Sequence, residues 1–137
     1  MTTTIQIIHP LVLALLVLGN FVSSTFAQEV TVPDPGLNAA IREVLQKPAG
    51  PLTENDMLNL TVLSACCRGI NSIQGLETAR NLTILDLHSN SLTNCVVPNS
   101  LTNLHIIDLF QNQLASFVVP AALSNLTIVD GTTKEAS

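Results

Sequence analysis

Residues 82–92 read LTILDLHSNSL, and similar stretches lie 22 residues away on either side: LTVLSACCRGI at 60–70 and LHIIDLFQNQL at 104–114. In all three, apolar residues hold the first, fourth, sixth and eleventh places. Two copies of Val-Val-Pro, ending at Pro98 and Pro120, follow the same spacing. Agreement of so many columns in one register indicates an internal repeat rather than a bias in composition.

Each unit predicts a short strand followed by a turn. In Leu85-Asp86-Leu87 the alternation points both leucines to one side and Asp86 to the other, as a strand requires. Asn90 follows where the chain turns, and its side chain can satisfy backbone groups that the turn leaves unpaired. Stacked units place equivalent strands side by side in a parallel sheet. Three full units cover 60–81, 82–103 and 104–125, and a fourth begins at Leu126, so the repeats span 60–130.

The stretch before the repeats predicts two helices. Asp34 is a good N-cap residue and Pro35 suits the first helical turn. Four apolar residues then fall on one face before the Pro-containing stretch 48–51, namely Leu37, Ile41, Val44 and Leu45. Residues 53–56, TEND, form a second helix start. We expect residues 28–59 to form a helical N-terminal cap over the open end of the repeat core.

Three features resemble bacterial secreted leucine-rich-repeat proteins of the internalin-like group: the segment 30–57, the Arg-Gly-Ile at 68–70, and units of the form N-L-T-x-L-D-L-x-x-N. The resemblance covers essentially all of 30–130. It implies an α/β repeat fold, in which a leucine-rich-repeat solenoid carries a short parallel β-sheet on its concave face and a helical N-terminal cap. It also implies that the concave face binds protein partners, including partners on cell surfaces.

The sequence departs from that group in three ways. The repeats are few, no C-terminal cap is recognisable, and no wall-sorting signal is visible. Gly131 stands where a leucine is expected, at the start of a polar tail at 131–137. Two functions therefore stay open. We favour a secreted binding module that presents its concave face to a protein or surface glycan, and the alternative is a structural spacer, or a truncated fragment of a longer repeat protein, with no specific ligand.

Composition excludes several functional classes. The chain has 137 residues, of which 47% are hydrophobic, and carries a net charge of −5 with no Trp or Tyr. This length favours a single domain. The acidic balance leaves no basic surface for nucleic acid, whose phosphates are bound by Lys and Arg. We therefore expect a protein partner, favoured to be basic, and no nucleic acid.

Residues 1–27 contain no Asp, Glu, Lys or Arg and include an apolar run from Leu11 to Leu18. The run is shorter than the roughly 18–20 residues that cross a bilayer. Thr25-Phe26-Ala27 has the small residues of a signal-peptidase site. We predict a cleaved signal peptide and an exported protein, either secreted or located in the periplasm or at the cell surface. Membrane attachment is the alternative if the segment is not cleaved.

Strand alternation predicts the residues of the concave face. An apolar row, an acidic row and a mixed row should run across the strands, with nine candidate partner-binding residues: Val62, Ile84, Asp86, His88, Ile106, Asp108, Phe110, Ile128 and Asp130. Aligned carboxylates would favour a basic partner. The simpler interpretation is that Asp habitually fills this repeat position and that β-branched residues suit strands.

The sequence predicts no catalytic residue, no cofactor and no metal site. Cys66 and His88 share a column with Asp86 or Asp108 nearby, which nominally supplies a nucleophile, a base and an acid. An open sheet face offers no evident oxyanion donors or water-excluding pocket, so we expect no enzyme. A linear carboxylate ladder does not form the cage of oxygens that Ca²⁺ requires. The cysteine spacing does not indicate zinc, and Cys95 is expected to be a buried core residue.

Two further expectations concern the surface. Asn59, Asn81 and Asn125 each begin Asn-Leu-Thr, a glycosylation acceptor pattern that the repeat itself also explains. We predict that Leu123, Leu126 and Val129 face outward from an uncapped last coil, which would favour self-association through that end.

Overall fold

The structure, a computed structural model, describes residues 28–129. The predicted signal peptide, Asp130 and the polar tail lie outside these residues. The helices are α1 (Pro35–Val44) and α2 (Glu54–Leu58), and 3₁₀ turns occupy Leu76–Thr78 and Ala121–Leu123. The strands are β1 (Val62–Ser64), β2 (Ile84–Asp86), β3 (Asn94–Val96), β4 (Ile106–Asp108), β5 (Ser116–Val118) and β6 (Thr127–Val129).

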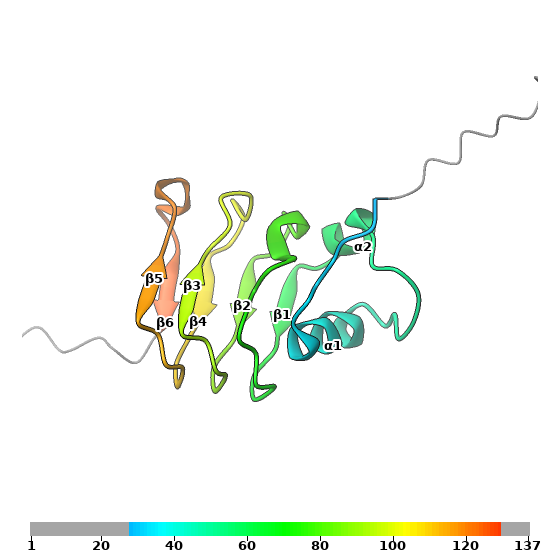
Figure 1. Ribbon diagram of the computed structural model, residues 1–137. Helices are drawn as coiled ribbons and strands as arrows, with labels where there is room; N and C mark the ends of the chain where they lie inside the picture. Colours follow the sequence, from blue (N-terminus) through cyan, green and yellow to red (C-terminus); the bar gives the residue numbers. More distant parts are fainter. Residues whose placement is uncertain (1–27, 130–137) are drawn as a thin grey trace, which may run out of the picture.

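The chain forms a solenoid of about three turns in which every strand pairs in parallel with its repeat neighbour (Figure 1). One sheet has the order β1-β2-β4-β6, and a second contains β3 and β5 on the return path of each turn. Val62 lies opposite Ile84, which lies opposite Ile106, so the 22-residue period sets the register directly. The predicted parallel sheet is confirmed, and the return path contains a second short sheet.

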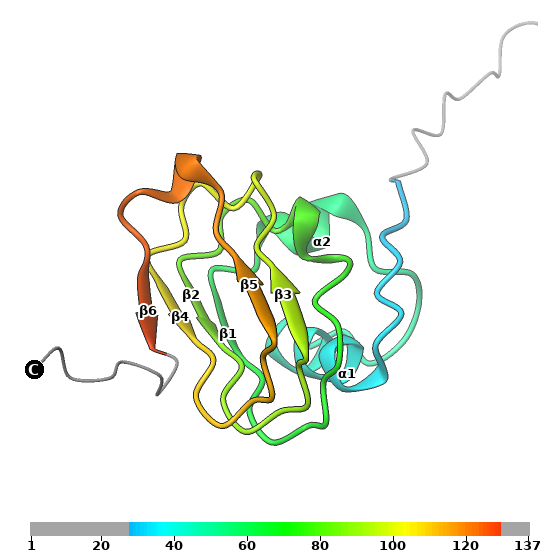
Figure 2. The same cartoon turned by 60° about the vertical axis from the view of Figure 1, so that its left-hand side comes forward.

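The core lies between the two sheets, which face each other in Figure 2. The apolar columns expected from the repeat are fully or almost fully buried in the first turns, including Leu63, Leu85 and Ile107. Cys95 is also buried, as predicted, and its burial raises the pKa of its thiol to about 11. In the last two turns Leu114, Phe117 and Leu126 are only partly buried.

Asn90 joins three stretches of backbone inside the solenoid. Its Oδ1 accepts hydrogen bonds from the backbone N–H groups of Arg68 (3.1 Å) and Ile70 (3.0 Å), one turn earlier. Its Nδ2 donates to the carbonyls of Ala65 and Leu87, both at 2.8 Å. The side chain is 5% exposed, so these bonds satisfy groups that the turn removes from water. Asn112 makes the equivalent contacts to Leu92 and Leu109 in the next turn.

Both helices lie at the β1 end of the four-stranded sheet (Figure 1). Asp34 is the N-cap of α1: its Oδ1 accepts the Leu37 N–H at 3.0 Å, while its Oδ2 accepts the Asn71 N–H at 2.8 Å. One carboxylate therefore fixes both the helix start and its position on the first turn. Leu37 and Ile41 are buried as predicted, but Val44 is 44% exposed. Val44 is the last residue of α1, and Leu45, which follows it on the predicted apolar face, is partly buried against the core.

α2 begins with the predicted capping motif. Thr53 is the N-cap, its Oγ1 accepts the Asp56 N–H, and Asp56 accepts the Thr53 N–H in return. Asp56 also pairs with Lys47 at 2.6 Å. The hydrogen bond from Lys47, followed by that from Thr53, lowers the pKa of Asp56 from 3.8 to about 2.

We expect Asp56→Asn to lower the free energy of unfolding by about 1 kcal/mol at neutral pH, since this partly exposed ion pair is screened by solvent. Because the folded-state pKa is depressed, the stabilisation is present above pH 3.8 and is lost as the pH falls toward about 2. Urea unfolding at pH 7 and pH 2 measures both values. A wild-type advantage of equal size at the two pH values would contradict this assignment.

In the fourth turn, the pairing of β6 with β4 differs from the register that the repeat predicts. β6 lies one residue away from the strict spacing, with Thr127 opposite Ile106 and Ile128 opposite Ile107. Ile128 therefore lies opposite Ile107 of the core column rather than in the predicted apolar row, but it is 36% exposed in this last described turn. The reason is that Ile128 and Val129 are both apolar, so the hydrophobic pattern accepts either register. Within residues 28–129 no further strand pairs with the outer edge of β6, so β4 alone sets its position.

Candidate functional site

The outward face of the four-stranded sheet, which is the predicted concave face, presents an exposed apolar row made of Val62, Ile84 and Ile106. These side chains are 45%, 36% and 39% exposed, and each lies beside a fully buried leucine or isoleucine of the same strand. Strand alternation explains both facts, since neighbouring residues point to opposite faces. The predicted row is therefore continuous over three strands, and Thr127 occupies its place on β6.

The second row contains Ser64, Asp86 and Asp108. Asp86 and Asp108 lie directly opposite each other on β2 and β4. Each carboxylate accepts a hydrogen bond from the backbone N–H two residues later, Asp86 from His88 at 3.1 Å and Asp108 from Phe110 at 2.9 Å. These bonds stabilise the turn after each strand, which gives the repeated Asp a structural role. Asp130, predicted for the same row, lies outside the described residues.

The third row contains Cys66, His88 and Phe110 at the ends of β1, β2 and β4. His88 Nδ1 lies 2.6 Å from Asp86 Oδ1. Burial alone would raise the pKa of Asp86, but the hydrogen bonds from the His88 N–H and ring and from Ser64 lower it overall. Phe110 is 45% exposed and is the large side chain of this row.

Cys67 is a residue of this site that strand alternation does not predict. Both thiols and one ring nitrogen of His88 lie within 4.8 Å of one another. Cys67 has a left-handed backbone with a φ of 61°, as do Ser89 and Gln111 at the same place in the following turns. That conformation brings the Cys67 thiol to the strand face, whereas simple alternation would turn it away. The 22-residue spacing of Cys67, Ser89 and Gln111 marks the turn but not its φ angle.

The environment of Cys66 does not suit a nucleophile. Its hydrogen bond with Cys67, together with partial burial, raises the pKa of the Cys66 thiol. An activated cysteine requires the opposite shift, because the thiolate is the reactive form. The arrangement of Cys66, His88 and Asp86 therefore has the residues of a catalytic group but not the electrostatics of one.

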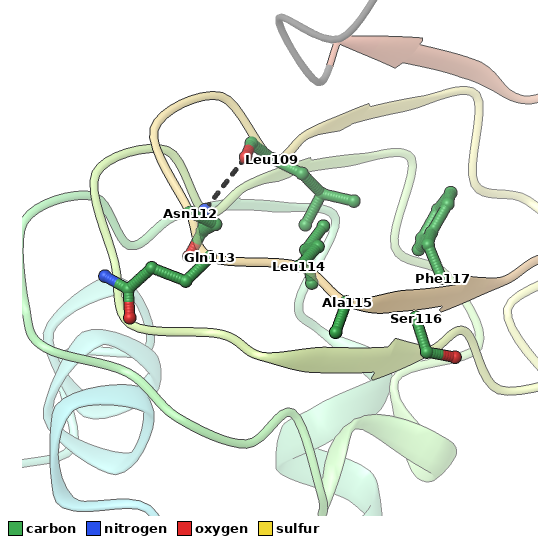
Figure 3. Close-up of a pocket in the computed structure, with 7 residues that line it drawn as sticks. All are labelled: Leu109, Asn112, Gln113, Leu114, Ala115, Ser116 and Phe117. Atoms are coloured by element: carbon green, nitrogen blue, oxygen red, sulfur yellow. Dashed lines mark hydrogen bonds between the residues drawn. The ribbon is translucent and has the colours of Figure 1, made fainter.

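A hollow of about 280 Å³ opens at the far end of the solenoid, lined by residues of the 109–117 stretch that include Leu114 and Phe117 (Figure 3). Leu123 is only 4% exposed, so its prediction as an outward-facing residue was wrong. The 3₁₀ turn that contains Leu123 folds its side chain into the core. Leu126 is half-buried and Val129 is 44% exposed, as expected for the last described turn.

The Asn-Leu-Thr positions fit the repeat interpretation. Asn81 is exposed, but its Nδ2 donates to the Leu58 carbonyl one turn earlier at 2.8 Å. Asn103, 22 residues later, donates in the same way to the Arg80 carbonyl at 2.9 Å. At 81 and 103 the asparagine thus links neighbouring turns, whereas the Asn59 side chain donates to the Asn55 carbonyl in α2.

No protein-family model and no curated protein matches this sequence. Among solved structures, the chain is similar to internalin C2 of Listeria monocytogenes, with 25% identity over 71% of this chain and 54% of that one, at a TM-score of 0.47. An internalin (inlF) of the same organism is 23% identical over 71% of this chain and 42% of that one, at a TM-score of 0.46. The structure of the CBM51-2 and INT domains of Clostridium perfringens ZmpB shows 27% identity over 66% of this chain and 17% of that one, at a TM-score of 0.47.

The chain thus spans about half or less of each of these proteins. The protein is a repeat solenoid, and internalins are among the solved structures that it resembles. Among residues 28–129, no helix has both the length and the apolarity needed to cross a membrane.

Proposed function

We propose that the protein is an exported leucine-rich-repeat module, internalin-like in organisation, that binds a protein partner through its concave strand face. In this proposal α1 and α2 serve as the N-terminal cap, and the signal peptide delivers the chain to the cell surface or its surroundings. The partner complements the face: apolar against the row of Val62, Ile84 and Ile106, and basic against Asp86 and Asp108.

The observation that carries the proposal is the exposed apolar row. Ile84 and Ile106 lie side by side in the middle of a rigid sheet, each more than a third exposed. Exposed apolar residues are ordinary when scattered singly, but a contiguous row bordered by polar side chains is typical of interaction surfaces. No Trp or Tyr is present and Phe110 is exposed on the same face, so we expect a partner held by shape and charge around one aromatic contact.

The acidic row is tested most cleanly by Asp86→Asn/Asp108→Asn. The amide oxygen still accepts the N–H bonds of His88 and Phe110, so the turns persist while two negative charges are removed. We expect a basic partner to bind about two- to tenfold more weakly at low salt, with the difference shrinking as salt screens the charges. Pull-down with the 28–137 form, followed by affinity measurement on the captured protein, checks this. The same affinity for both proteins at low salt would remove the acidic row from the interface.

The second candidate is a structural spacer or a segment of a longer repeat protein with no specific ligand. The half-buried Leu114 and Phe117 around the terminal hollow favour it, since a further turn stacked there would cover them. For a spacer of this kind, we expect no partner whose binding depends on the concave face. We also expect the chain to associate through the hollow and the edge of β6, which sedimentation velocity measures.

A further inference from the structure

Two thiols and an imidazole meet where β1 and β2 end on the concave side. The Sγ atoms of Cys66 and Cys67 and a ring nitrogen of His88 lie within 4.8 Å of one another. In a tetrahedral zinc site, bond lengths of about 2.3 Å to sulfur and 2.0 Å to nitrogen place the ligand atoms about 3.5–3.8 Å apart. Small side-chain adjustments would therefore bring these three atoms around one ion. We propose that Cys66, Cys67 and His88 bind a single Zn²⁺ ion, with a fourth position left for water or for a side chain of a partner.

The backbone explains why two adjacent cysteines can serve one ion. Cys66 follows strand β1 and lies on the concave side, and the left-handed φ of 61° at Cys67 keeps its side chain close to that of Cys66. Ser89 and Gln111 adopt the same conformation at the equivalent positions, with φ values of 54° and 55°. The turn itself therefore does not require a cysteine. The paired thiols are a feature of this one turn, placed opposite His88 at the end of the neighbouring strand.

Asp86 orients the histidine. In the tautomer in which Nδ1 of His88 carries the proton, the Asp86 carboxylate accepts it across the 2.6 Å contact, and the Nε2 lone pair is then free to coordinate a metal. Ser64 fixes Asp86 in turn, from Oγ to Oδ2 at 3.2 Å. A carboxylate that holds a metal-binding histidine in this way is a recurrent feature of zinc sites. Asp108 also lies within 4.8 Å of the Asp86 and His88 ligand atoms and adds negative charge next to the ion.

The donor set selects the kind of metal. Thiolate and imidazole ligands suit Zn²⁺, whereas Ca²⁺ and Mg²⁺ require cages of oxygen atoms. On binding, each thiol gives its proton to solvent and the sulfur donates to the ion, so no electron transfer is involved. The proposal goes beyond the proposed partner binding and does not depend on it, because all three ligands come from this chain.

Co²⁺ titration of the reduced, purified chain tests the site, because tetrahedral cobalt with thiolate ligands gives intense charge-transfer absorption. We expect the absorption to saturate at one Co²⁺ per chain and Zn²⁺ to displace it. Cys66→Ser and Cys67→Ser should each weaken binding by at least tenfold, whereas Asp86→Asn should weaken it by about 10- to 100-fold with the thiolate bands retained. Cys95→Ala is the matched control and should bind normally, since Cys95 is buried in the core.

A second measurement on the unaltered chain covers the case in which a serine variant does not fold. Zn²⁺ should protect both Cys66 and Cys67 from alkylation by iodoacetamide, as read by mass spectrometry. No thiolate-to-cobalt absorption in the wild-type chain, or alkylation of the two cysteines at the same rate with and without Zn²⁺, would overturn the proposal.

Discussion

Asn90→Ala is expected to lower the free energy of unfolding by about 3 kcal/mol, among the largest effects of any single substitution in this chain. The variant leaves the N–H groups of Arg68 and Ile70 without their acceptor, and the carbonyls of Ala65 and Leu87 without a donor. Several of these groups are buried, so water cannot replace the lost bonds without opening the turn. The bonds also join neighbouring turns, so we expect the first two turns to lose stability together.

Asn112→Ala is the matched control. Asn112 makes the same kind of contacts to Leu87, Leu92 and Leu109, but it is only partly buried. We expect about half the loss or less, because solvent reaches part of that turn. Urea unfolding followed by far-ultraviolet circular dichroism measures both, since the chain has no Trp for fluorescence. Equal losses for the two variants, or a loss below about 1 kcal/mol for Asn90→Ala, would show that the buried asparagine does not hold the turns together.

Leu85→Ala is expected to cost about 3–4 kcal/mol, whereas Ile84→Ala, at the adjacent residue, should cost about 1 kcal/mol or less. Leu85 is fully buried in the central column between Leu63 and Ile107, so truncation leaves a cavity bounded by both neighbouring turns. Ile84 is 36% exposed on the concave face, and its truncation removes fewer contacts.

Comparison of Leu85→Ala with Ile84→Ala tests whether side chains alternate between the core and the exposed face, as the concave face requires. Thermal and urea unfolding of both variants give the two differences directly. If Ile84→Ala destabilised the chain as much as Leu85→Ala, the two residues would share the core, and the apolar row would not be an exposed surface.

The sequence predicted most of the fold because the repeat fixes many positions at once. The 22-residue spacing alone assigns Leu63, Leu85 and Ile107 to one column, and the turn that follows each strand indicates the buried role of Asn90. The register of β6 could not be predicted, because Ile128 and Val129 satisfy either alignment and no further described strand constrains them.

The candidate site was predicted less completely than the fold. The apolar row at Val62, Ile84 and Ile106 followed from alternation alone. The position of Cys67 depends on a positive φ angle in the turn, which hydrophobic patterning does not reveal. The dual role of Asp86, which accepts from both the His88 backbone and the His88 ring, likewise depends on side-chain geometry that spacing does not fix.

In the proposed function, the protein binds its partner through the concave strand face. Two double variants with the same charge change test it most directly: Ile84→Lys/Ile106→Lys on that face, and Val96→Lys/Val118→Lys on the β3–β5 sheet. Both pairs are exposed and lie on adjacent parallel strands, so they disturb folding comparably. With the partner captured by the wild-type 28–137 form, we predict at least a tenfold loss of affinity for the first variant and wild-type affinity for the second. Equal affinity for the two variants, or a loss confined to Val96→Lys/Val118→Lys, would contradict the account.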